Sequence, residues 1–342
     1  MVGFLTSQTS RLKTALGEGV RRWDHFWFAP QSPIALCWLR ILSGCMLIYT
    51  HVIWGLDFDA FFGPTGFQDP LLVRTLQKES AAQSFWWLVP DAMQWPVHLG
   101  CIAILVLYTA GFLTRVTSIL AAVITISYAH RAPLANFGLD QVNSFLVVYL
   151  ALAPCGKTWS IDRLWERWRL ARSAVRSGRA PVFVAAAPVA SARVVTRLLQ
   201  IQVCVVYLFA SLGKLKGEAW WDGNAIWMAI ANQEYQSADL TWLCHFPWLI
   251  NLLTHFTVAW ELTFAALVWR PRWRPLVLAA GILMHLGIGA FLGMWTFGLA
   301  MILSYLSFAP PEACAAIESA VAKRFLAGTR VITCGPGWIG RQ

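Results

Sequence analysis

The sequence predicts an all-α fold, a polytopic membrane bundle of about eight transmembrane helices, on three observations. Hydrophobic residues make up 58% of the 342 residues and charged residues only 13%, roughly half the charged share of a typical soluble domain. Apolar runs near the length of about 20 residues that spans a bilayer recur along the chain. The segments between these runs alternate between basic and acidic. We therefore expect a multi-pass protein of the cell membrane, in contact with the lipid bilayer.

The expected spans form two groups of four, separated by a long polar segment. The third, fourth and eighth runs are short, so we expect their ends to extend a few residues further. The approximate limits are 33–54, 94–113, 115–130, 140–154, 195–213, 247–268, 275–292 and 294–309.

Charge predicts the orientation of the bundle. Cytoplasmic loops of membrane proteins carry the excess of Lys and Arg, so the basic segments are assigned to the cytoplasm, which places both termini there. The formal net charge of +10 then reflects topology and attraction to anionic lipid. Because the cations are spread over several loops, we expect no nucleic-acid partner. The basic segments are 1–30, the turn at Arg115, 155–194, 270–274 and the tail; the acidic ones include 55–93 and 214–246.

The expected domain organisation follows from these spans. A cytoplasmic leader, 1–30, precedes a transmembrane domain, 31–310, and a cytoplasmic tail, 311–342, follows it. The leader lacks the continuous apolar core of a cleavable signal, so the first span is expected to direct insertion. The eight cysteines form no CxxC pair, so neither a zinc site nor any other metal site is predicted.

The cytoplasmic linker, 155–194, begins with WSIDRLWERWRLAR. Ser160 is a suitable amino-terminal cap for a helix, in which Leu164, Trp165 and Trp168 share one face. Such a helix is typical of segments that lie on a membrane surface. The following VFVAAAPVA is interpreted as part of a loose linker, with a re-entrant membrane segment as the alternative.

Ionisable side chains within the spans need a partner or a function, because each costs about 2.5–3.5 kcal/mol or more in hydrocarbon. Arg40 lies about two turns from the inner end of the first span, and Glu261 lies at a similar depth in the sixth. We therefore predict a structural ion pair between Arg40 and Glu261. The alternative is that Arg40 extends to the inner surface.

Two histidines lie halfway along the sixth and seventh predicted spans. His255 and His285 could each relay protons, bind a ligand, or hydrogen-bond a neighbouring backbone carbonyl. Small residues around His285, such as Gly281 and Gly289, allow close helix packing and also leave room for a ligand. Both histidines are therefore candidate ligand-binding residues.

A further polar group gathers at the predicted outer ends of the spans. We expect it to line the mouth of an outward-facing pocket. Lys214 ends the fifth span and is either an interfacial anchor or the reactive group of this site. The pocket residues are His51, Arg131, Asp140, Asn143 and Lys214.

Several stretches from Trp23 to Pro310, in the right order, resemble the horizontally transferred transmembrane (HTTM) family, the membrane domain shared with vitamin K-dependent gamma-carboxylase. They are WDHFWFAPQSPIALCWLRILSG, FFGPTGF, GLDQVNSFLVVYLALAPCGKTWSIDRL, VVYLFASLGKLKGEAWWDG, WELTFAALVW and ILMHLGIGAFLGMWTFGLAMILSYLSF.

The resemblance implies a candidate mechanism. In the carboxylase a helix-terminal lysine is understood to act as the base toward vitamin K hydroquinone, and Lys214 occupies the matching place in an A-x-x-x-K-L frame. Such a base must be neutral, which requires an apolar pocket. Glu261 and His285 match an acidic residue and a histidine of the carboxylase at the same separation.

The sequence also departs from the carboxylase. Gly213 stands where the carboxylase has a second lysine, and FGLDQVNS contains no histidine where the carboxylase has an Asn-His pair. The large extramembrane part that grips the protein substrate is not expected here. Glutamate carboxylation is therefore not expected, whereas a quinone or another apolar ligand is. The alternative is a non-enzymatic carrier of lipid or small solutes, or a membrane partner of another protein.

Overall fold

The computed structural model describes residues 2–78, 82–179, 186–310, 313–314 and 316. These residues are mostly helical, and they contain no β-strand apart from a single antiparallel bridge between Gln31 and Val189. The predicted all-α class is confirmed for this part of the chain.

A helix occurs at each of the eight predicted positions, with limits close to those expected. They are α2 (Ile34–Leu56), α5 (Gln94–Ala110), α6 (Thr114–Arg131), α7 (Gly138–Ala151), α9 (Ala190–Lys214), α12 (Pro247–Leu267), α13 (Arg274–Leu292), and α14 (Trp295–Ser304) with the 3-10 turn η5 (Tyr305–Phe308).

Five of these helices are long and apolar enough to cross a membrane: α2, α5 with the turn before it, α9, α12 and α13. They support the assignment to membranes. The other three are shorter or less apolar, because α7 has 14 residues and α14 has 10, while α6 contains several Ser and Thr residues. Eight spans and cytoplasmic termini therefore stay predictions.

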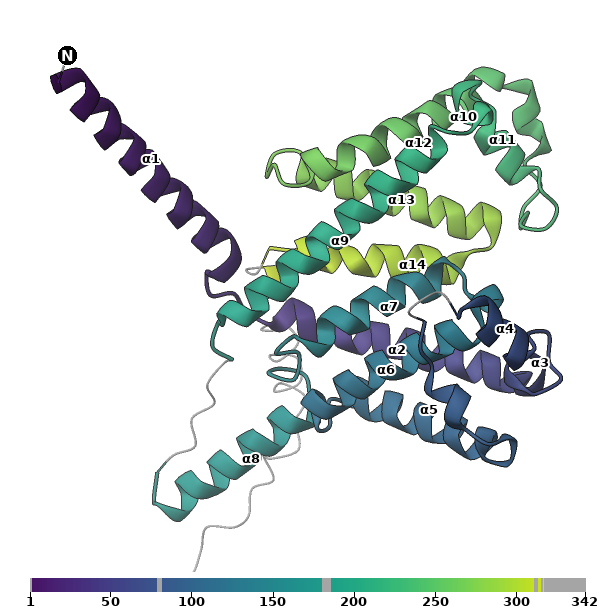
Figure 1. Cartoon of the computed structure of the whole chain (residues 1–342), viewed down its shortest axis with the longest axis horizontal. Coiled ribbons are helices and arrows are strands. Elements are labelled where there is room, and N and C mark those ends of the chain that lie inside the picture. The colour runs from purple at the N-terminus through teal and green to yellow at the C-terminus, as the bar shows by residue number, and fades with distance from the viewer. Residues whose placement is uncertain (1, 79–81, 180–185, 311–312, 315, 317–342) are drawn as a thin grey trace, which may run out of the picture.

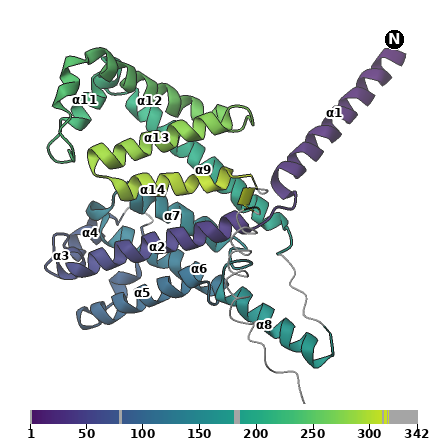
Figure 2. The ribbon, with the colours of Figure 1, turned by 180° about the vertical axis from the view of Figure 1, so that it is seen from behind.

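The helices form two packed groups with α14 between them (Figures 1 and 2). In the first group, α5 packs against α2 and α6, and α6 packs against α7; in the second, α12 packs against α9. The helix α14 contacts α13, α7 and α2. The arrangement thus departs from two separate groups of four, because α14 contacts helices of both groups.

The leader forms a long helix, α1 (Val2–Phe28), that projects from the bundle (Figure 1). Its end is attached to the start of α9, where Arg193 and Arg197 donate hydrogen bonds to the carbonyl of Phe26. The Arg197 guanidinium also lies over the rings of Phe26, at 4.2 Å, and Trp269, at 5.4 Å. Such cation–π contacts fix where the leader leaves the bundle.

Between α2 and α5, short helices fold over one end of the bundle. In α3 (Phe58–Phe62), Phe58 and Phe62 are buried against the aromatic side chains of the first group. The helix α4 (Pro70–Leu76) follows, with Asp69 as its cap. Arg131, at the end of α6, is buried beneath this cover and donates hydrogen bonds to the carbonyls of Gln68 and Phe62.

The linker contains the predicted amphipathic helix, α8 (Ile161–Arg176). Its cap is the one predicted, since the Ser160 hydroxyl accepts a hydrogen bond from the amide of Arg163 at 3.0 Å. The re-entrant alternative falls partly outside the described residues. Residues 186–188 form no helix, and α9 begins at Ala190.

We predict that Arg131→Met destabilises the fold by about 1.5–3 kcal/mol, because buried carbonyls lose a charged donor. The thermal unfolding midpoint of the protein in detergent would fall, and protease cleavage within 58–76 would increase. Arg115→Met is the control, because Arg115 is exposed at the other end of α6. Equal midpoints for the two variants would contradict this role of Arg131.

Candidate functional site

A buried ion pair joins α9 to α12. Lys214 is the last residue of α9, and its ammonium lies 2.8 Å from both carboxylate oxygens of Glu261. The side chain of Glu261 is 6% exposed and that of Lys214 is 23% exposed. The ammonium also lies 5.2 Å from the centre of the Trp220 ring. Lys214 is therefore not a freely solvated anchor in this structure.

The pair lies deep along α12. Glu261 follows Pro247, the first residue of this helix, by fourteen positions, which is about 20 Å along the axis at 1.5 Å per residue. Lys214 reaches it because α9 ends beside the middle of α12, where the Ser211 hydroxyl donates to the carbonyl of Val258. The lysine predicted at a pocket mouth thus directs its charge into the helix bundle.

The predicted ion pair between Arg40 and Glu261 is wrong. Arg40 is fully buried, and its guanidinium donates hydrogen bonds to the carbonyls of Cys155 and Trp159. Both acceptors belong to the turn that precedes α8. This turn folds back over the start of α2 and supplies acceptors to Arg40, while Lys214 supplies the cation for Glu261. Arg40 therefore does not extend to the surface either.

Three side chains form a hydrogen-bonded chain next to the ion pair. The Tyr207 hydroxyl lies 2.7 Å from Nε2 of His285 and also hydrogen-bonds the hydroxyl of Tyr305. The ring of Tyr207 also packs against Trp260, the residue before Glu261, with ring centres 4.9 Å apart. A Cβ atom on Gly281 would lie 2.3 Å from the Tyr305 hydroxyl. The glycine near His285 therefore makes room for this tyrosine.

A cavity of about 540 Å³ lies at the end of the bundle where α2 ends and α7 and α14 begin. Phe297 of α14 is part of its wall and packs edge-on against His285, with ring centres 5.6 Å apart. A Cβ atom on Gly138 would lie 2.6 Å from this ring. The lining residues are Tyr49, Thr50, Ile53, Trp54, Phe61, Ala135, Phe137, Gly138, Leu139, Asp140, Gly293, Met294, Thr296 and Phe297.

Of the five residues predicted to line a pocket mouth, Asp140 alone lines this cavity. Its carboxylate also accepts a hydrogen bond from the amide of Phe137 and so caps α7. His51 is buried, with Nδ1 at 2.8 Å from the carbonyl of Leu47 and its ring against Tyr128. The five residues predicted to line one pocket mouth therefore do not form a single site.

Asn143 is also fully buried, one turn after Asp140 in α7. Neither polar atom of its side chain has a hydrogen-bond partner among the described residues. It does not line the cavity. A buried amide of this kind is uncommon in proteins, so Asn143 is kept as a candidate for contact with a ligand.

His255 does not join His285. Its ring nitrogens contact the carbonyls of Asn251, at 2.9 Å, and Trp221, at 3.2 Å. Trp221 belongs to the short helix α10 (Glu218–Trp221), which packs with α11 (Ala225–Ile230) against α12. The structure therefore gives His255 the third of its predicted roles, a hydrogen bond to backbone that connects neighbouring segments.

Three buried residues of these polar clusters were not predicted from the sequence. Tyr207 lies seven positions before Lys214 and therefore shares its helix face, a signal that was available. Tyr305 follows an apolar run and carries no comparable signal. His98 of α5 contacts the Tyr128 hydroxyl at 2.7 Å and forms a second buried cluster, in the first helix group.

Comparisons of the chain with protein-family models, curated proteins and solved structures gave no match. The function is therefore inferred from the site itself.

We predict that Lys214→Met destabilises the protein by about 3 kcal/mol, because it leaves a buried carboxylate without its cation. Adding Glu261→Met should restore most of the loss, since the pair is then replaced by apolar side chains. The measurement is the thermal unfolding midpoint in detergent, analysed as a double-mutant cycle. Lys216→Met, at an exposed neighbouring lysine, is the control. Additive effects of the two substitutions would show that the side chains are not coupled.

Proposed function

We propose that this chain is an integral membrane protein of the HTTM kind that binds a flat apolar ligand, such as a quinone, and exchanges a proton with it through Lys214 and Glu261. The observation that carries the proposal is the buried ion pair between these residues. Ionisable groups within membrane helices are rare and mark functional sites by default.

The surroundings of the pair support proton exchange. Tyr207, His285 and Tyr305 form a hydrogen-bonded chain beside it, and each carries a group that can both donate and accept. The ring of Phe297 connects this chain to the cavity wall. The ring of Phe297 would thus lie between a ligand in the cavity and the hydrogen-bonded chain that begins at His285.

The cavity suits a flat apolar molecule. Its volume of about 540 Å³ is within the range of about 300–1,000 Å³ typical of small-molecule sites. Trp54, Phe61 and Phe297 provide aromatic surface, and Asp140 and Thr50 provide polar atoms. The aromatic side chains of such a site contact the faces of a flat ring. Its polar atoms orient the ring by hydrogen bonds to the oxygen atoms of the ligand.

The chemistry follows from the ion pair. Lys214 can act as a base only when it is neutral, and Glu261 is placed to take the proton from its ammonium. The neutral amine then takes up a proton that a ligand hydroxyl releases through the chain of His285 and Tyr207, so that one O–H bond of the ligand breaks and one N–H bond of Lys214 forms. This step agrees with the resemblance to the carboxylase membrane domain, but it includes no carboxylation of glutamate.

A carrier would require polar groups in series across the bundle. His255 and Arg40, which would have extended such a path beyond His285, instead hydrogen-bond backbone carbonyls away from it. Within the described residues the geometry therefore favours a binding site over this route of transport.

The test is retention and titration of decylubiquinol by the purified full-length protein in detergent. We expect Thr296→Trp, which fills the cavity, to weaken binding more than tenfold. Val52→Trp, on the exposed face of α2, should bind normally. Lys214→Met should keep binding but lose the ionisation of the bound quinol, which is measured by its ultraviolet absorbance. Equal affinity of the two tryptophan variants would overturn the assignment of the cavity.

A further inference from the structure

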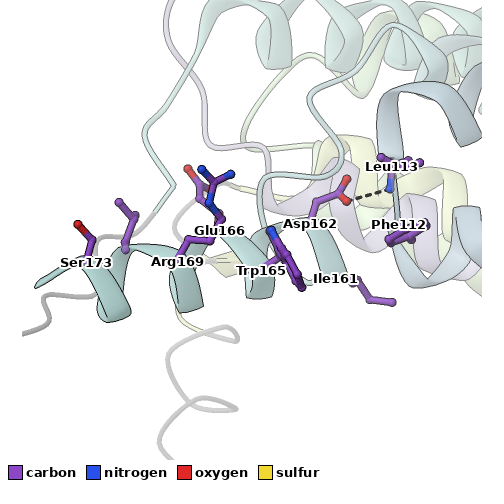
Figure 3. Close-up of a pocket in the computed structure, with 9 residues that line it drawn as sticks. Phe112, Leu113, Ile161, Asp162, Trp165, Glu166, Arg169 and Ser173 are labelled. Carbon is purple, nitrogen blue, oxygen red and sulfur yellow. Dashed lines mark hydrogen bonds between the residues drawn. The ribbon is translucent and has the colours of Figure 1, made fainter. Parts of the chain in front are cut away.

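A groove of about 830 Å³ runs along α8 beside the turn that joins α5 to α6 (Figure 3). It lies apart from the cavity and the ion pair described above. Its lining residues are Phe112, Leu113, Ile161, Asp162, Trp165, Glu166, Arg169, Leu170 and Ser173.

The groove is fixed at the end of two bundle helices. The Asp162 carboxylate accepts hydrogen bonds from the amides of Leu113, at 2.8 Å, and Thr114, at 2.7 Å. It also accepts one from the Thr114 hydroxyl. These bonds cap the first turn of α6. The start of α8 is thus attached where α5 ends and α6 begins (Figure 3).

Within the part of the chain that the structure describes, the walls of the groove are apolar and exposed. Phe112 is 41% exposed and Trp165 is 61% exposed, and Figure 3 shows them on opposite sides, one from each element. Along α8, Ile161, Leu164 and Trp168 continue the apolar face at helical spacing. An amphipathic helix with such a face is suited to the boundary between lipid headgroups and acyl chains.

The charged side chains that line the groove are Asp162, Glu166 and Arg169. Arg172 and Arg176 follow Arg169 on the next turns of α8, and the Arg172 guanidinium lies 5.1 Å from the centre of the Trp168 ring. The acidic neighbours are already engaged: Asp162 by the amides of α6, and Glu166 by Arg163 at 2.6 Å. The hydrogen bond from Arg163 lowers the pKa of Glu166.

We propose that this groove binds an anionic phospholipid of the adjacent leaflet. Its acyl chains lie against Phe112, Leu113 and Trp165, and its phosphate is held by Arg169, with Arg172 and Arg176 beyond it. Attraction between an anionic membrane surface and each nearby Lys or Arg is worth about 1 kcal/mol. The occupant is therefore a lipid, whose acyl chains match the exposed apolar side chains and whose phosphate matches the neighbouring arginines.

The test compares dioleoyl phosphatidylglycerol with dioleoyl phosphatidylcholine on the full-length protein in detergent, by native mass spectrometry, with inorganic phosphate as a third probe. The triple variant Arg169→Gln/Arg172→Gln/Arg176→Gln should reduce the preference for phosphatidylglycerol by more than tenfold. The control, Arg21→Gln/Arg22→Gln/Arg272→Gln, removes the same charge at exposed positions and should keep it.

A second variant tests the acyl side. Trp165→Ser should weaken phosphatidylglycerol and phosphatidylcholine alike, and the thermal midpoint reports whether each variant is folded. The proposal is overturned if both triple variants lose the preference equally, which would indicate net charge alone. It is also overturned if inorganic phosphate displaces the lipid at equal concentration, or if Trp165→Ser binds as the wild type does.

Discussion

The structure depends on the requirement that every charge among its apolar helices has a partner. The side chain of Glu261 is buried within α12, with 6% of its surface exposed, so little water is left to solvate its charge. Lys214 supplies the cation through two short contacts. Because the partners belong to different helices, this pair fixes α9 against α12, and the chain of Tyr207, His285 and Tyr305 is built around it.

The buried arginines meet the same requirement in another way. Arg40 and Arg131 are each satisfied by backbone carbonyls of a connecting segment. One segment leads into α8 and the other covers the opposite end of the first helix group. These cations thus attach loops to the bundle, whereas the charge of Lys214 is held by a group that can itself take up a proton. This difference is why the proposed chemistry is assigned to Lys214.

Hydropathy predicted the positions of the eight apolar helices, because an apolar run of this length has few other stable conformations in a membrane. The cap at Ser160 was predictable for a similar reason, since its partner is only three residues away. Interaction partners that are distant in the sequence could not be predicted in this way. The depths of Arg40 and Glu261 matched, yet depth does not report which helices are neighbours or where a loop returns. The contacts of α14 with both helix groups were missed for the same reason.

The central claim is that Glu261 is an ionised carboxylate held by Lys214 away from water. Infrared difference spectra of the protein in lipid nanodiscs, taken against Glu261→Gln at neutral pH, test it most directly. The wild type should show the carboxylate bands of Glu261. Lys214→Met should replace them with the carbonyl band of a protonated acid, because a buried carboxylate without a cation takes up a proton. Unchanged carboxylate bands in Lys214→Met would contradict the account, since they would mean that water, and not the lysine, supports the charge.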